Sequence, residues 1–114
     1  MGVVRNGSTG AMLADQASHA TNPWTRFRGL MLRRHLEPGG GLVIRPCGSI
    51  HMMFMRFPID AVFFDRSGQV TKVVSRLRPW IGLAFGGRGA AGVVELPVGA
   101  AAGTQAGHQL KFEP

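Results

Sequence analysis

The sequence predicts a compact, mostly β domain, either a β-sandwich or a β-barrel of about seven short strands with one short helix. Short apolar segments recur along the 114 residues, and turn sequences rich in Gly, Pro, Asn and Asp separate them roughly every ten residues. Hydrophobic residues make up 45% of the chain, which is enough for one buried core without disulfide bonds. No internal repeat is visible.

The charge composition indicates a basic protein. The chain has 13 Lys and Arg against 6 Asp and Glu, for a net charge of +7. The basic residues are scattered and never form more than a pair, whereas a nucleic-acid binder usually clusters its charge on one face. A solvated basic surface is therefore favoured over a nucleic-acid interface. The Arg-, Ala- and Gly-rich composition also fits a GC-rich genome.

The single cysteine and the lack of long apolar runs bear on the compartment. Cys47 has no second cysteine with which to form an internal disulfide. Residues 1–20 contain no apolar run of signal-peptide length, and no stretch approaches the roughly 18 apolar residues of a membrane span. We therefore expect a cytoplasmic protein without a membrane span.

The N-terminal residues 1–20 are predicted to form a hairpin. Asn6-Gly7 suits a tight turn that requires positive φ angles, and short apolar segments flank it. The first strand is expected to fray, as chain termini do. Residues 21–114 are predicted to form a single β-rich domain.

The one predicted helix lies near residues 23–33. Asn22 can cap its start, and Pro23 suits the first helical position. The apolar residues that follow recur at three- and four-residue spacing, which is typical of one helix face. They are Trp24, Phe27, Leu30 and Met31.

The central and C-terminal segments read as strands. Residues 50–55 are apolar on both faces, which is typical of a strand buried on both sides. The segments 59–64 and 69–77, joined by a turn at 65–68, are predicted to form a hairpin. Shorter strands are expected at 42–45, 92–96 and 108–112. The Gly-rich segment 78–92 is predicted to be an ordered loop or a lid.

Several short segments follow one another in a characteristic order. They are Arg28-Gly29-Leu30-Met31, Gly41-Leu42, Ser49-Ile50-His51, Met55-Arg56-Phe57-Pro58-Ile59-Asp60, Val62-Phe63-Phe64-Asp65 and Glu95-Leu96-Pro97-Val98-Gly99. This pattern resembles the domain of unknown function 192 family, a group of small uncharacterised prokaryotic proteins, over about residues 24–112. The resemblance implies a jelly-roll-like sandwich and brings no established activity. In two places the chain departs from the family pattern: Met52 replaces a common Thr, and His108 follows Gly107 where the family usually has Asp.

A polar cluster around the apolar centre of the chain is the candidate ligand-binding site. Asp60 follows a Pro turn with Arg56 four residues before it, and an Arg–carboxylate pair would satisfy both charges. Such charges either form a buried network that fixes the fold or line a ligand pocket. The candidate residues are His51, Arg56, Asp60, Glu95, Trp80 and Arg28.

Cys47, His51 and His108 are a weaker candidate set of metal ligands. Cysteine and histidine suit zinc or copper. On an extended strand, however, residues four apart lie roughly 13 Å from each other, so Cys47 and His51 could share a metal only if the backbone bends. The same separation disfavours a Cys–His nucleophile pair.

The leading functional hypothesis is a non-enzymatic β-domain that binds a small molecule or a protein. No phosphate loop, dinucleotide fingerprint, nucleophile elbow or zinc-finger spacing is present, so we expect no cofactor and no catalytic residue. Two alternatives remain open. One is a metal protein or enzyme that uses Cys47 and His51, and the other is a basic nucleic-acid-binding module.

Overall fold

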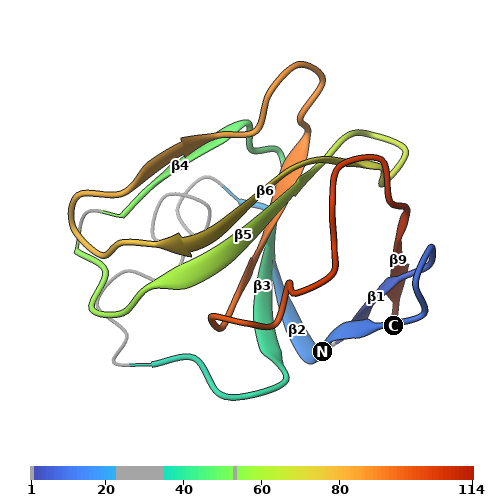
Figure 1. Ribbon diagram of the computed structural model, residues 1–114, viewed down its shortest axis with the longest axis horizontal. Coiled ribbons are helices and arrows are strands. Elements are labelled where there is room, and N and C mark those ends of the chain that lie inside the picture. The colour runs from blue at the N-terminus through green and yellow to red at the C-terminus, as the bar shows by residue number, and fades with distance from the viewer. Residues whose placement is uncertain (1, 23–34, 53) are drawn as a thin grey trace.

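The structure, a computed structural model, describes residues 2–22, 35–52 and 54–114, and within these ranges it contains nine strands (Figure 1). They are β1 (Gly2–Asn6), β2 (Met12–Ala20), β3 (Gly40–Ile44), β4 (Ser49–His51), β5 (Ile59–Phe64), β6 (Val70–Leu77), β7 (Leu83–Phe85), β8 (Gly92–Leu96) and β9 (Leu110–Glu113). The predicted mostly-β class is confirmed. The predicted helix at 23–33 lies outside the described residues. In the described part of the chain, no helix has the length and apolar character needed to cross a membrane.

Seven strands form one mixed sheet in the order β6-β5-β8-β3-β2-β1-β9. Only the pairing of β2 with β3 is parallel. The two edge strands meet at one end, where Gln69 pairs with Gln109 and the Val70 amide donates to the His108 carbonyl at 2.8 Å. The sheet therefore curls towards a barrel that is closed at this end. The jelly-roll arrangement implied by the family resemblance is not confirmed by this strand order.

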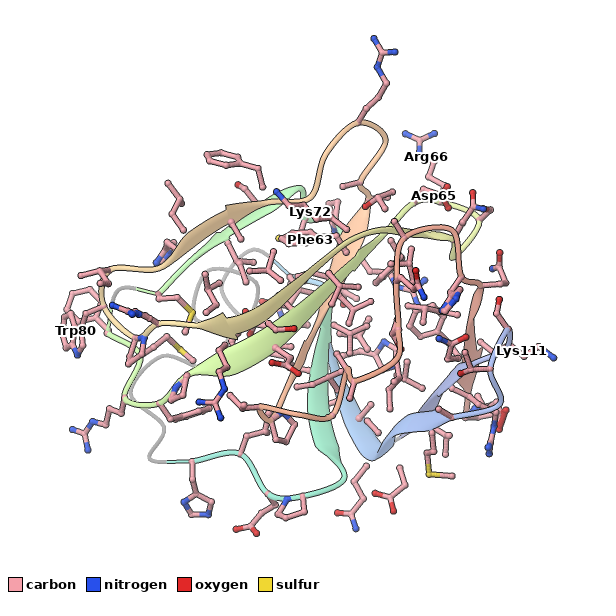
Figure 2. All side chains as sticks on the ribbon, in the orientation of Figure 1. Phe63, Asp65, Arg66, Lys72, Trp80 and Lys111 are labelled. Carbon is pink, nitrogen blue, oxygen red and sulfur yellow. The ribbon has the colours of Figure 1, made fainter. Side chains whose placement is uncertain are left out.

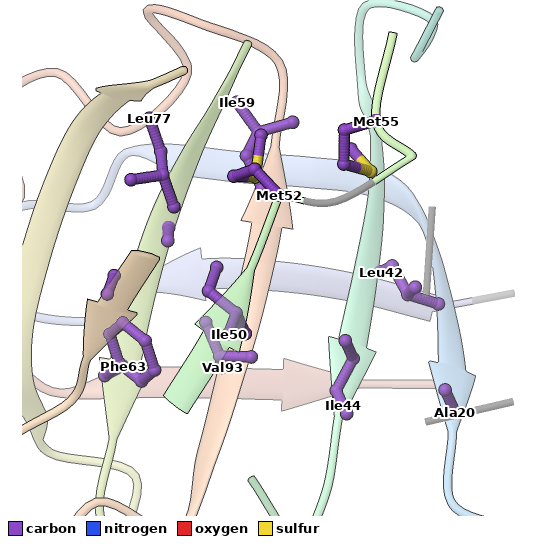
Figure 3. Close-up of a cluster of buried hydrophobic side chains, with 12 residues drawn as sticks. Ala20, Leu42, Ile44, Ile50, Met52, Met55, Ile59, Phe63, Leu77 and Val93 are labelled. Carbon is purple, nitrogen blue, oxygen red and sulfur yellow. The ribbon is translucent and has the colours of Figure 1, made fainter. Parts of the chain in front are cut away.

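Each face of the curled sheet buries its own hydrophobic cluster. Successive residues of a strand point to opposite faces, and every residue of β5 is buried. Ile59 and Phe63 of β5 belong to the first cluster, which Figure 3 shows, and Val62 and Phe64 belong to the second. The apolar run in β5 is therefore the signature of a strand that is covered on both sides.

A second, two-stranded sheet covers the first cluster. In it β4 and β7 pair antiparallel, with Ile50 opposite Ala84, and both side chains are buried in the cluster. Gly86, directly after β7, lies so close to the core that an added Cβ would come within 2.4 Å of the Phe63 ring. The small layer thus approaches the main sheet where glycine leaves room.

The predicted strands at 59–64 and 92–96 match β5 and β8. The strand predicted over 50–55 was wrong beyond His51, because the Met52 carbonyl accepts the Met55 amide at 3.1 Å and closes a turn there. The loop predicted over 78–92 was wrong in part, because it contains β7. The predicted N-terminal hairpin forms as β1 and β2, and β1 also pairs with β9.

Candidate functional site

Five large apolar side chains lie exposed on the outer side of the β4–β7 layer and in the loops beside it. They are Phe54, Trp80, Ile81, Leu83 and Phe85, with exposed fractions between 44% and 75%. We call these five residues the apolar surface. Leu83 and Phe85 flank the buried Ala84 in β7, so they point outward on the same side. Figure 2 shows Trp80 at one extreme end of the molecule.

Two aromatic residues of the apolar surface contact each other. The rings of Phe54 and Trp80 meet edge to face, with centroids 5.2 Å apart and planes at 63°. Both residues have positive φ angles, 64° and 68°. This left-handed backbone conformation costs bulky residues about 1–3 kcal/mol each. The exposed Phe54–Trp80 pair is therefore built on a strained backbone.

Met52 lies just before Phe54 in the chain and is hydrogen-bonded to the turn that contains Trp80. Its carbonyl accepts the Trp80 amide at 2.7 Å, and its amide donates to the Gly82 carbonyl at 2.9 Å. The Met52 side chain is fully buried in the first cluster. At Gly82 an added Cβ would lie 2.5 Å from the Arg78 carbonyl oxygen and 2.7 Å from the Met52 side chain. The conformation of the Trp80 loop therefore depends on a buried methionine and a glycine.

The two chain segments that carry the apolar surface are basic and lack acids. The segments 46–58 and 70–91, which carry all five of its residues, contain no Asp or Glu. They contain five cationic residues, and the side chains of all five are exposed: Arg56, Lys72, Arg76, Arg78 and Arg88. Asp65, one of the acids outside these segments, lies towards the end of the molecule opposite Trp80 (Figure 2). The segments that carry the apolar surface are therefore rich in both exposed apolar and exposed cationic side chains.

Asp60, a predicted site residue, is buried and accepts three main-chain hydrogen bonds. Its Oδ1 accepts the Arg76 amide at 3.0 Å, and its Oδ2 accepts the amides of Gly99 at 2.9 Å and Ala101 at 3.2 Å. Arg76 has a positive φ of 52°, so Asp60 fixes an irregular point of β6. Arg56, the predicted partner of Asp60, is exposed. The Asp60 carboxylate thus joins β6 to the loop after β8.

The structure places the two predicted acids on opposite faces of the sheet. In the pairing of β5 with β8, Asp60 lies opposite Leu96 and Ala61 lies opposite Glu95. Because neighbouring residues of a strand alternate in direction, Glu95 points to the face of the first cluster and Asp60 to the face of the second. Both side chains are buried. Arg28 lies outside the described residues. Asp60 and Glu95 therefore do not line one pocket.

The three predicted metal ligands lie in different surroundings. The Cys47 thiol donates to the Ser49 carbonyl at 3.0 Å, and Cys47 lines a pocket of about 490 Å³ with Arg66 and residues 89–91. His51 is exposed on the outer face of β4, opposite Leu83. His108 contacts Asn6 where the sheet closes. Nowhere in the described ranges do three or more His, Cys, Asp or Glu side chains gather in a way that could hold a metal ion.

His108 acts as a hydrogen-bond acceptor. Its Nδ1 lies 3.0 Å from the amide nitrogen of the fully buried Asn6 side chain and accepts the Gln105 main-chain amide at 3.3 Å. The Asn6 amide nitrogen also donates to Thr104 at 3.1 Å. A carboxylate at this position could accept the same two donors.

We expect His108→Leu to lower the free energy of unfolding by about 1–3 kcal/mol, because a buried donor loses its acceptor. His108→Asp restores an acceptor and should stay within about 1 kcal/mol of wild type. Urea denaturation of the three proteins measures both differences. Equal losses in the two variants would contradict an acceptor role for His108.

The sequence patterns did not identify four residues of the apolar surface as site residues: Phe54, Ile81, Leu83 and Phe85. The alternation of the last three with Gly82 and Ala84 was the available signal, but the surrounding glycines favoured a loop. Three predicted site residues do lie at this surface or beside it along the chain. They are His51, Arg56 and Trp80.

The fold and this surface define a small protein with a curled mixed sheet and one apolar, basic face. The chain belongs to the domain of unknown function 192 family, described as an uncharacterized ACR, whose model matches residues 4–112. The match confirms the family resemblance and extends it over the N-terminal hairpin.

Three proteins similar to this chain show the extent of the likeness. A UPF0127 protein from Thermococcus sibiricus is 35% identical over an alignment of 98 residues that covers 82% of this chain and 62% of that protein, so the chain spans less than two thirds of its relative. A protein of unknown function from Novosphingobium aromaticivorans has a TM-score of 0.85 at 20% identity, covering 97% of this chain and 84% of its own. A "putative transcription regulator" from Sinorhizobium meliloti has the same TM-score at 23% identity, covering 97% and 92%. At these identities the two structures show the fold alone.

Proposed function

We propose that the protein is a non-enzymatic binding domain of the cytoplasm, and that the apolar surface receives its partner. The observation that carries this proposal is the clustering of five large exposed apolar side chains around a strained aromatic pair. Single exposed apolar residues are normal on a protein surface, but adjacent ones mark interaction sites. Trp80 and an Arg-rich border are also the residue types that dominate binding energy at interfaces.

The positions of the chemically active side chains support binding rather than catalysis. A nucleophile or general base needs a partner within hydrogen-bonding distance and a shared cavity. Asp60 is occupied by three amides of the fold, and Glu95 lies on the opposite face. Cys47 packs against the first cluster, whereas His51 lies exposed opposite Leu83. Asp60, Glu95, Cys47 and His51 therefore contact different parts of the molecule.

Photo-crosslinking in cells tests the proposal. A photoreactive phenylalanine analogue replaces Phe85 in one variant and Met12 in a control, because Met12 of β2 is 48% exposed but lies outside the apolar surface. We expect adducts, with either protein or lipid, from position 85 and only background from position 12. Equal adduct formation at both positions, or none at position 85, would overturn the proposal.

A further inference from the structure

We propose that the partner of the apolar surface is an anionic membrane surface, to which the protein binds peripherally. This inference rests on the proposed function, since it names the occupant of the same surface. The combination of exposed apolar side chains, the basic and acid-free segments that carry them, and the position of Trp80 at one end of the molecule carries it.

The charge around the surface selects an anionic occupant. Five exposed cations and no acid lie in the two segments that form it. A second copy of the chain, packed about a two-fold axis, would bring the same patch against itself and juxtapose ten cations. Like charges across an interface oppose association. An anionic surface instead attracts the cations of these segments.

The side chains of the surface suit the boundary between lipid headgroups and acyl chains. Tryptophan concentrates at this boundary, and Phe, Ile and Leu insert below it in peripheral proteins. Ile81 and Leu83 are exposed apolar residues that follow Trp80 closely in the chain. Arg78 lies two residues before Trp80, directly after the end of β6 at Leu77. Insertion of such side chains needs no matching pocket on the partner.

Protein interfaces, in contrast, usually combine an apolar centre with about one hydrogen bond per 100–200 Å². On the outer face of the β4–β7 layer, the polar residues of β4 are Ser49 and His51, opposite Phe85 and Leu83. The small number of polar residues on this strand pair favours a fluid, non-directional partner. An acidic protein remains the competing occupant, and the experiment below separates the two.

Flotation with lipid vesicles tests the inference. The full chain is mixed with vesicles of phosphatidylcholine alone, or of phosphatidylcholine with phosphatidylglycerol. We expect binding only to the anionic vesicles, weakening as salt screens the charges. Trp80→Ser with Leu83→Ser should reduce binding at least about ten-fold, because the inserted apolar area is lost. Arg78→Glu should reduce it by about five-fold or more.

Lys111→Glu is the matched control for charge. Lys111 is exposed and lies at the end of the molecule opposite Trp80 (Figure 2), so this variant changes the net charge as Arg78→Glu does. It should bind the anionic vesicles much as wild type does. Equal losses in the two charge variants, or no binding of wild type to anionic vesicles, would overturn the inference. Protein adducts at position 85 without vesicle binding would leave the proposed binding function standing and reject the membrane as its partner.

Discussion

Replacing Asp60 with Ala is expected to lower the free energy of unfolding by about 3–5 kcal/mol. Asp60 is buried, and its carboxylate is the acceptor for three main-chain amides, those of Arg76, Gly99 and Ala101. The alanine leaves these donors without that acceptor, and an unsatisfied buried donor costs more than a lost hydrogen bond between exposed groups. Urea denaturation at neutral pH measures the loss.

Two further variants keep this prediction testable. Asp60→Asn preserves the shape of the side chain but turns its NH₂ group towards at least one main-chain donor. It should therefore lose less free energy of unfolding than Asp60→Ala. It also gives a protein that can be measured if the alanine variant does not fold. Asp15→Ala removes an exposed carboxylate and should stay within about 0.5 kcal/mol of wild type. An Asp60→Ala protein as stable as Asp15→Ala would show that the three hydrogen bonds do not support the fold.

The second large effect is expected from Met52→Ala, with a loss of about 2–5 kcal/mol. Met52 is fully buried in the first cluster, close to Ile59 and Met55 (Figure 3). The shorter side chain removes apolar contacts and leaves a cavity beneath the turn that carries Trp80. Because Met52 also bonds that turn through its main chain, vesicle binding should weaken in the same variant.

Met12 provides the matched control for this substitution, because it is the same residue type in an exposed position of β2. Met12→Ala should change the stability by no more than about 0.5 kcal/mol. Met52→Leu roughly conserves the volume and should cost less than about 1.5 kcal/mol. If Met52→Ala and Met12→Ala were equally stable, the buried methionine would not be what supports the Trp80 turn.

Local patterns were enough to predict the strands whose residues are buried on both faces. The runs 59–64 and 92–96 are apolar and flanked by turn residues, and they form β5 and β8. The short β7 escaped prediction, because three residues between glycines carry too little periodicity to distinguish a strand from a loop. The end of β4 at His51 could not be predicted either, because it depends on the hydrogen bonds of Met52 to Trp80 and Gly82, which join distant parts of the chain.

The candidate site was predictable only in part for the same reason. Trp80 and His51 could be singled out by residue type, but the sequence also suggested that Asp60 pairs with Arg56. Its actual partners, the amides of Arg76, Gly99 and Ala101, are 16 to 41 residues away along the chain. A main-chain donor has no sequence signature, so no motif could have indicated this arrangement.

The sequence by itself determined the mostly-β class and the family. Only the tertiary structure decided that Leu83 and Phe85 share a strand face that is open to solvent, that the edges of the large sheet meet at Gln69 and Gln109, and that Asp60 and Glu95 point to opposite faces. The physical reason is that periodicity is local and says which residues share a face. Whether another layer covers that face depends on contacts between segments far apart in the chain.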